Sequence, residues 1–95
     1  MSIRFEWDSA KALRNHKDHG VSFPEAVTVF YDDSARLLDD PEHSDTEERF
    51  LMMGLSGHLR ILVVCHCYRE NDNVIRLISA RKATKNEARS YRGNQ

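Results

Sequence analysis

Apolar residues are densest between Arg60 and Lys82, in two runs separated by a polar tetrapeptide. The runs read RILVVCHCYR and VIRLISARK, with ENDN between them. Two β-branched runs that flank a polar turn predict a β-hairpin. Because apolar residues fill nearly every place in both runs, we expect a central pair of strands covered on both faces.

The N-terminal pattern predicts a short strand and then a helix. Residues 3–7 alternate between apolar and charged side chains, which favours an edge strand. Asp8 is a good N-cap for a helix that runs to about His19, with Gly20 as the residue after its end. The residues expected on the inner face of this helix are Ala10, Leu13 and either His16 or Lys17.

A capping box predicts a second helix directly afterwards. In Ser22-Phe23-Pro24-Glu25, the Ser22 hydroxyl is expected to accept from the Glu25 amide, and the Glu25 carboxylate to reach back. The helix is expected to run from about Phe23 to Phe30. Its expected buried residues are Ala26, Val27, Val29 and Phe30.

The remaining elements complete an α+β pattern. Ala35–Leu38 and Glu48–Leu55 are strand candidates on either side of an acidic loop, Asp39–Glu47. Thr84 and Glu87 form a second capping box, which opens a last helix that ends near Arg92. Two helices, a meander of about four strands and a third helix predict one α+β domain over residues 1–95.

Two-residue turns at Gly57-His58 and Asn71-Asp72 would fix the strand register and place His66 between Arg49 and Leu77 of the neighbouring strands. A slip of one residue would exchange the two faces. In that register one face carries Arg49, Leu51, Met53, Leu62, Val64, His66, Tyr68, Ile75, Leu77, Ser79 and Arg81. The opposite face is more purely apolar, and we expect the first two helices there. The mixed face then suits a functional site.

The charges divide unevenly along the chain, although the net charge is only −1. Residues 1–48 hold 5 Lys and Arg against 12 Asp and Glu, whereas residues 49–95 hold 9 against 3. Such a division predicts a basic surface for an anionic partner. The alternative is that the two halves interleave in space and their charges average out.

Cations beside a histidine indicate phosphodiester chemistry. Metal-free RNA cleavage needs a base for the 2′-OH, a proton donor for the leaving oxygen and cations for the charge on the phosphate. His66 is the candidate acid or base, because its reference pKa lies near neutrality. Arg49 and Arg81 are the candidates for holding the phosphate. The structural alternatives are a hydrogen-bonded core histidine and an Arg49 that pairs with Glu48 at the surface.

Further residues are candidates for RNA binding. Lys82 precedes the last helix and Lys85 lies in its first turn, where backbone amides and cations together favour an anion. Tyr68 is a candidate for stacking on a base. Ser79 and Arg89 complete the expected set.

Cofactors and membranes are not expected. Cys65 and Cys67 point the same way on the predicted strand, about 6.6 Å apart, so a mutual disulfide is disfavoured and reduced thiols are expected. His66 points the opposite way, so these three residues do not predict a metal site. No apolar run approaches the length of a transmembrane helix, and no signal peptide is evident, so a cytoplasmic protein is expected.

Three blocks of the sequence together resemble the BrnT toxins of type II toxin–antitoxin systems. The blocks are Phe5-Glu6-Trp7-Asp8 with Lys11 and Asn15, His19-Gly20-Val21-Ser22-Phe23 with Glu25 and Ala26, and Ile78-Ser79-Ala80-Arg81-Lys82-Ala83 with Glu87 and Tyr91. They occur in order at this spacing over nearly the whole chain. One departure is Asp18, where family members often have Lys, and this puts a basic RNA contact at that helix end in doubt.

The resemblance implies a RelE-like fold, a curved antiparallel sheet flanked by helices. It implies a small endoribonuclease that arrests growth by cutting RNA. With the candidate residues above, we expect a metal-independent reaction in which 2′-OH attack leaves a cyclic phosphate. The partner would be a BrnA-like antitoxin with a ribbon-helix-helix region, in a complex of two toxins with two antitoxins that contacts operator DNA only through the antitoxin. The positions that match polar places of the family are Arg49, His66, Ser79, Arg81 and Lys82.

Two rival functions follow from the same residues. One is a non-catalytic module that binds RNA or ribosomes through the basic half, for which His66 would matter little. The other is a degenerate toxin that acts only as a co-repressor with its antitoxin and never arrests growth. A neighbouring reading frame for a ribbon-helix-helix protein would favour the toxin or co-repressor over the lone RNA binder.

Overall fold

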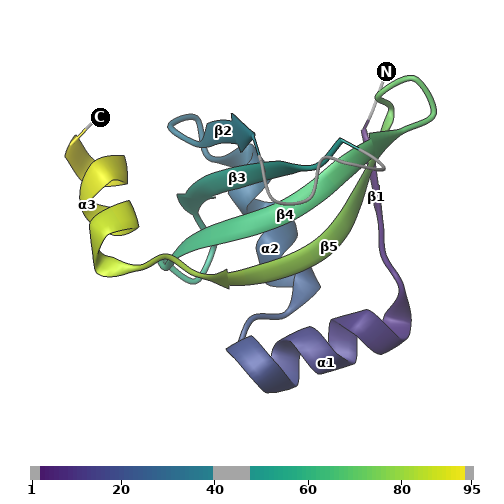
Figure 1. Cartoon of the computed structure of the whole chain (residues 1–95), viewed down its shortest axis with the longest axis horizontal. Helices are drawn as coiled ribbons and strands as arrows, with labels where there is room; N and C mark the ends of the chain where they lie inside the picture. The colour runs from purple at the N-terminus through teal and green to yellow at the C-terminus, as the bar shows by residue number, and fades with distance from the viewer. Residues whose placement is uncertain (1–2, 40–47, 94–95) are drawn as a thin grey trace.

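The computed structural model describes residues 3–39 and 48–93. In this part of the chain, helices pack around a five-stranded sheet (Figure 1). The elements in chain order are β1 (Arg4–Glu6), α1 (Ser9–His19), α2 (Phe23–Thr28), a 3₁₀ turn η1 (Val29–Tyr31), β2 (Arg36–Asp39), β3 (Phe50–Leu55), β4 (Ile61–Arg69), β5 (Val74–Lys82) and α3 (Lys85–Gly93). This architecture confirms the predicted α+β class. The loop predicted over Asp39–Glu47 lies mostly outside the described residues.

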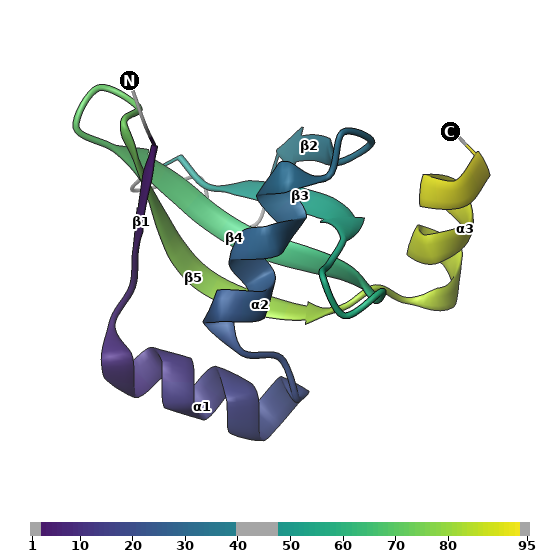
Figure 2. The same cartoon turned by 180° about the vertical axis from the view of Figure 1, so that it is seen from behind.

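The strand order is β1-β5-β4-β3-β2. β1 runs parallel to β5, and the other neighbours are antiparallel. Figure 2 shows α2 lying across one face of the sheet and α3 beyond the end of β5. Arg76 of β5 pairs with Glu6 of the neighbouring β1, at 2.9 Å.

The ends of α1 lie where the sequence predicts them, but the residues on its buried face differ from those predicted. Asp8 accepts from the Lys11 amide, and Gly20 adopts a left-handed φ of 70° at the C-terminal end. Leu13, however, is 75% exposed, and Ala10, His16 and Lys17 are exposed as well. Ala12 packs on the core and Asn15 is buried instead.

Asn15 determines that orientation because it completes the edge of the sheet. β1 pairs with β5 only as far as Arg76. Farther along β5, the Asn15 side chain accepts from the Ala80 amide and donates to the Ala80 carbonyl, at 2.9 Å each. A third hydrogen bond, which Asn15 donates to the Val21 carbonyl at 2.9 Å, holds the chain after α1. One side chain thus satisfies backbone groups that would otherwise be left unpaired in the interior.

The capping box at Ser22 is only half formed. The Ser22 hydroxyl accepts from the Glu25 amide, as predicted. The Glu25 carboxylate instead accepts from Arg60 and from the Ser56 hydroxyl, and the Arg60 hydrogen bond is the largest cause of its lowered pKa. This buried carboxylate fixes the loop between β3 and β4 beneath α2. The box at Thr84 is complete, since Thr84 and Glu87 each accept from the other's amide.

The register differs from the prediction by one residue between β3 and β4. His66 lies opposite Phe50, not Arg49, because the connecting turn is longer than two residues and closes between Ser56 and Arg60. Between β4 and β5 the predicted pairing of His66 with Leu77 is correct, but a bulge shifts the register beyond it. Cys65 therefore pairs with Ser79, and Val63 with Arg81.

The helices consequently cover the face of β4 opposite to the one predicted, whereas Met52 and Ala80 lie under them as predicted. Under α1 and α2 lies the core of Val21, Phe23, Ala26, Val29, Leu62, Val64, Ile75, Leu77 and Ala80. We call this sheet face, which also carries His66, the α2 face. The other face carries Met53, Val63 and Arg81, and Tyr91 of α3 packs there on Met53 and Val63. We call it the α3 face.

Candidate functional site

His66 lies in an aromatic cluster inside the protein. It has no exposed surface, and its Nδ1 and Nε2 lie 3.1 Å from the Val64 carbonyl and 3.3 Å from the Tyr68 hydroxyl. The Phe30 ring meets the imidazole edge-on at 4.9 Å between centroids. Burial lowers the pKa of His66, so the imidazole is neutral near pH 7. These contacts support the structural alternative, and the catalytic role of His66 stays a prediction.

Arg81 lies on the α3 face, away from His66. The strand partner of His66 is Leu77, whereas that of Val63, three residues earlier on β4, is Arg81. Three residues of a strand span about 10 Å, and the two side chains are also on opposite faces. The structure therefore does not bring these two predicted catalytic residues together.

The Arg81 guanidinium is fixed at the start of α3. Its Nη1 and Nη2 donate to the two carboxylate oxygens of Glu87, at 2.8 and 3.0 Å, and Nη1 also bonds the Lys82 carbonyl at 3.3 Å. The same pair lowers the pKa of Glu87 to about 2 and raises that of Arg81. Within the described chain, Nε and the second Nη2 hydrogen have no such partner. These two N–H groups lie on one side of the guanidinium and are spaced to bind two oxygens of a phosphate.

Arg49 lies away from Arg81 along the sheet. It directly precedes β3 and is half-buried, four residues from Met53, which lies beside the Arg81 position. Four residues of a strand span about 13 Å. Its predicted role in holding the phosphate thus stays a prediction, and the structure does not place it beside Arg81.

Two of the predicted RNA-binding cations lie together on α3. Lys85 and Arg89 line a hollow of about 410 Å³ with Arg92. Lys82 pairs with Leu62 and so points to the α2 side of the strand end. Ser79 lies elsewhere, in a hollow of about 230 Å³ that it shares with Lys11, Arg14, Asn15, Asp18, His19 and Ile78. Tyr68 is at the far end of β4.

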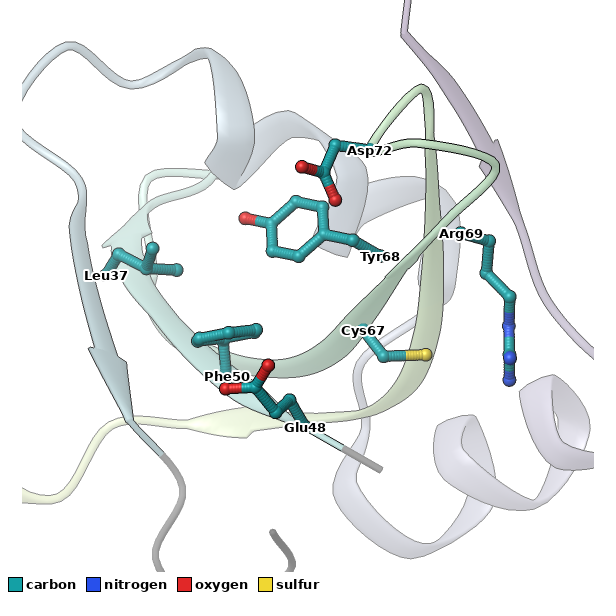
Figure 3. Close-up of a pocket in the computed structure, with 7 residues that line it drawn as sticks. All are labelled: Leu37, Glu48, Phe50, Cys67, Tyr68, Arg69 and Asp72. Atoms are coloured by element: carbon teal, nitrogen blue, oxygen red, sulfur yellow. The ribbon is translucent and has the colours of Figure 1, made fainter. Parts of the chain in front are cut away.

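Tyr68 lines a separate hollow of about 630 Å³, which we call the Tyr68 pocket (Figure 3). Its lining residues are Leu37, Glu48, Phe50, Cys67, Tyr68, Arg69 and Asp72. Burial is the main cause that raises the pKa of Tyr68, and the Asp72 charge adds to it. The sequence pattern does not predict this pocket, because its residues come from four separate segments of the chain.

The two cysteines are buried on the side of β4 opposite His66, as predicted. In the part of the chain that the structure describes, no group of three or more His, Cys, Asp and Glu side chains is placed to hold a metal ion. None of the described helices is long and apolar enough to cross a membrane.

Comparison with protein families identifies the chain. Residues 7–87 match the family model described as the ribonuclease toxin BrnT of type II toxin–antitoxin systems. The chain belongs to the BrnT family. Membership in this family of ribonuclease toxins implies an antitoxin partner. The match contains β5 and the Arg81–Glu87 pair at the start of α3.

The fold agrees with a solved member of the BrnT family. The crystal structure of the Brucella abortus ribonuclease toxin BrnT superposes with a TM-score of 0.66 at 23% sequence identity, over 88% of this chain and all of that one. A search of curated proteins finds no match. The family thus follows from the sequence match, and the fold is supported by the structure.

Proposed function

We propose that this BrnT-family chain cleaves RNA on the α3 face of its sheet, with Arg81 holding the scissile phosphate. The observation that supports this site is that the Nε and Nη2 hydrogens on one side of the Arg81 guanidinium have no partner among the described residues. Glu87 occupies the other edge and fixes its orientation. Lys85 and Arg89 lie along the adjoining helix, where they would attract neighbouring phosphates of the strand.

The proposed reaction is metal-independent transesterification. The 2′-oxygen attacks the adjacent phosphorus, the bond from phosphorus to the 5′-oxygen breaks, and a 2′,3′-cyclic phosphate and a 5′-hydroxyl remain. A base accepts the 2′-OH proton and an acid donates one to the 5′-oxygen, so the step is balanced. Arg81 would stabilise the negative charge that develops on the phosphate oxygens. The sequence also predicts His66 and Arg49 for this site, but they lie away from Arg81 and the proposed step does not use them.

The biological role proposed is that of a growth-arresting toxin with a RelE-like fold. Its partner would be a BrnA-like ribbon-helix-helix antitoxin, in a complex of two copies of each. This complex would contact operator DNA through the antitoxin alone. Family membership supports the antitoxin, and the ribbon-helix-helix region and the stoichiometry rest on the sequence resemblance.

The reaction class is tested with purified protein and a synthetic RNA in the presence of a chelator. We expect cleavage that the chelator leaves unchanged, and fragments whose 3′ ends are cyclic phosphates. RNA bound but left intact would favour the non-catalytic RNA- or ribosome-binding module. Neither binding nor cleavage, from folded protein that still binds its antitoxin, would favour the co-repressor.

A further inference from the structure

The Tyr68 pocket has the composition of a site for a basic side chain. Figure 3 shows Tyr68, Phe50 and Leu37 facing one another across the hollow, with the Asp72 carboxylate above Tyr68 and that of Glu48 beside Phe50. The Phe50 and Tyr68 rings are 5.4 Å apart between centroids. Arg69 and Cys67 point away from the rings. Two ring faces and two carboxylates match a guanidinium or ammonium group.

A second hollow adjoins this pocket at Tyr68. It measures about 520 Å³, and we call it the Phe30 groove. Its lining residues are Ile3, Phe5, Phe30, Tyr31, Met52, Tyr68 and Ile75. Ile3 is 52% exposed and Tyr31 73%, so large apolar side chains border it at the surface. Apolar surface gathered around such a groove is typical of a protein interaction site.

The charge of this surface decides against RNA as its occupant. Glu48 and Asp72 are both exposed carboxylates that would repel phosphates. The cations proposed to contact RNA lie at the opposite end of β5, near α3. A protein segment with apolar side chains and a neighbouring Arg or Lys complements both hollows.

We propose that the Tyr68 pocket and the Phe30 groove together bind a segment of the antitoxin, with an Arg or Lys side chain in the pocket and apolar side chains in the groove. This proposal rests on the proposed function in one respect, that an antitoxin restrains the chain's activity. Such a segment has the amphipathic character of known groove-binding partners. The surface lies away from Arg81, so the antitoxin would not need to cover that arginine.

The test uses the antitoxin from the reading frame beside the chain's own gene, purified and titrated against the toxin. Glu48→Gln with Asp72→Asn removes both carboxylates and preserves side-chain shape, and Asn tolerates the left-handed φ of 69° at position 72. We expect the affinity for the antitoxin to fall at least tenfold. RNA cleavage by the unbound variant should stay at the wild-type rate.

Glu70→Gln is the matched control, because Glu70 lies in the same turn but pairs with Arg4 at 3.1 Å and does not line the pocket. This variant should bind the antitoxin as the wild type does. Equal binding by the double variant and the wild type would overturn the proposal. So would equal losses in the double variant and in Glu70→Gln, since general charge would then explain both.

The groove is tested separately with two exposed apolar residues. Tyr31→Ala should weaken antitoxin binding, whereas Leu13→Ala, at a residue 75% exposed on α1, should not. Equal binding by both variants would contradict the groove. A Tyr31→Ala variant that alters only self-association of the toxin, measured by sedimentation, would assign the groove to a second copy and overturn the proposal.

Failure of the proposed function gives a different result. If wild-type protein neither cleaves RNA nor arrests growth, yet binds its antitoxin through Glu48 and Asp72, the surface proposal stands and the ribonuclease proposal falls. If the wild type cleaves RNA and the double variant is neutralised at the wild-type antitoxin dose, the surface proposal falls alone.

Discussion

At the scale of single residues, Glu87 combines two roles in one carboxylate. It completes the capping box of α3 with Thr84, and it holds two nitrogens of the Arg81 guanidinium. If Arg81 binds phosphate, Glu87 positions it. The complete capping box supplies a way to separate that role from simple helix stability.

We expect Glu87→Gln to slow RNA cleavage at least tenfold, because Gln cannot accept from both Arg81 nitrogens. Thr84→Ala removes the hydroxyl that accepts from the Glu87 amide but leaves the Arg81 pair intact. This control should lose about 1 kcal/mol of stability and keep its cleavage rate. KM and kcat measured with a short RNA would separate the variants. Equal rate losses that follow helix fraying, measured by circular dichroism, would leave Glu87 a structural residue only.

His66 is best tested with a ring of similar size. We expect folded His66→Phe protein to cleave RNA within about twofold of the wild-type rate, because the imidazole is buried and neutral among aromatic side chains. Cleavage is compared after thermal unfolding shows both proteins folded. A folded variant that has lost cleavage would establish a role for the imidazole in the chemistry.

Glu25 makes stability depend on pH. The pKa of Glu25 is lowered in the folded chain, chiefly by the Arg60 hydrogen bond. Its contribution to the free energy of unfolding is therefore complete above its ordinary pKa of 4.5. That contribution is lost as the pH falls through the folded-state pKa. Glu25→Gln should cost about 3 kcal/mol at pH 7 and flatten the acid side of the stability curve. Urea unfolding between pH 3 and 7 measures the stability loss and the pH dependence. If the stability of Glu25→Gln falls with acid as steeply as that of the wild type, Glu25 is not the cause of the pH dependence.

At the scale of elements, the edge of β5 is completed by a side chain instead of a strand. Asn15 bonds both backbone groups of Ala80 from α1. It is this contact that turns Leu13 outward and Ala12 inward.

Asn15→Ala should lower stability by about 3 kcal/mol, because it leaves buried backbone groups of Ala80 without partners. Hydrogen exchange at the Ala80 amide should accelerate more than at other central β5 amides. The exposed neighbour Arg14 provides the control, since Arg14→Ala should change neither quantity. Unchanged Ala80 exchange in Asn15→Ala would contradict the role of α1 at this edge.

The sequence predicted elements better than the contacts between them. Caps and turn residues are local, so Asp8, Gly20 and Thr84 mark helix ends correctly. Register depends on turn length and bulges, and the loop that closes from Ser56 to Arg60 shifted β3 by one residue. That shift put Phe50 instead of Arg49 opposite His66, and the separate bulge beside His66 put His66 and Arg81 on opposite faces. The candidate site was therefore predicted in its residue types but not in its assembly.

At the scale of the whole molecule, the two ends of the sheet differ in chemistry. Cations of α3 lie beside Arg81 at one end, and carboxylates with aromatic rings form the Tyr68 pocket at the other. An RNA site and an antitoxin site could then be occupied without competing for one surface.

The most direct measurement compares RNA cleavage by purified Arg81→Ala and Arg76→Ala proteins. Both arginines lie on β5 and pair with a carboxylate, Glu87 or Glu6, but only Arg81 adjoins the α3 cations. We predict that Arg81→Ala slows cleavage at least 100-fold while remaining folded, and that Arg76→Ala cleaves at nearly the wild-type rate. Cleavage by folded Arg81→Ala at the wild-type rate would contradict the proposed site.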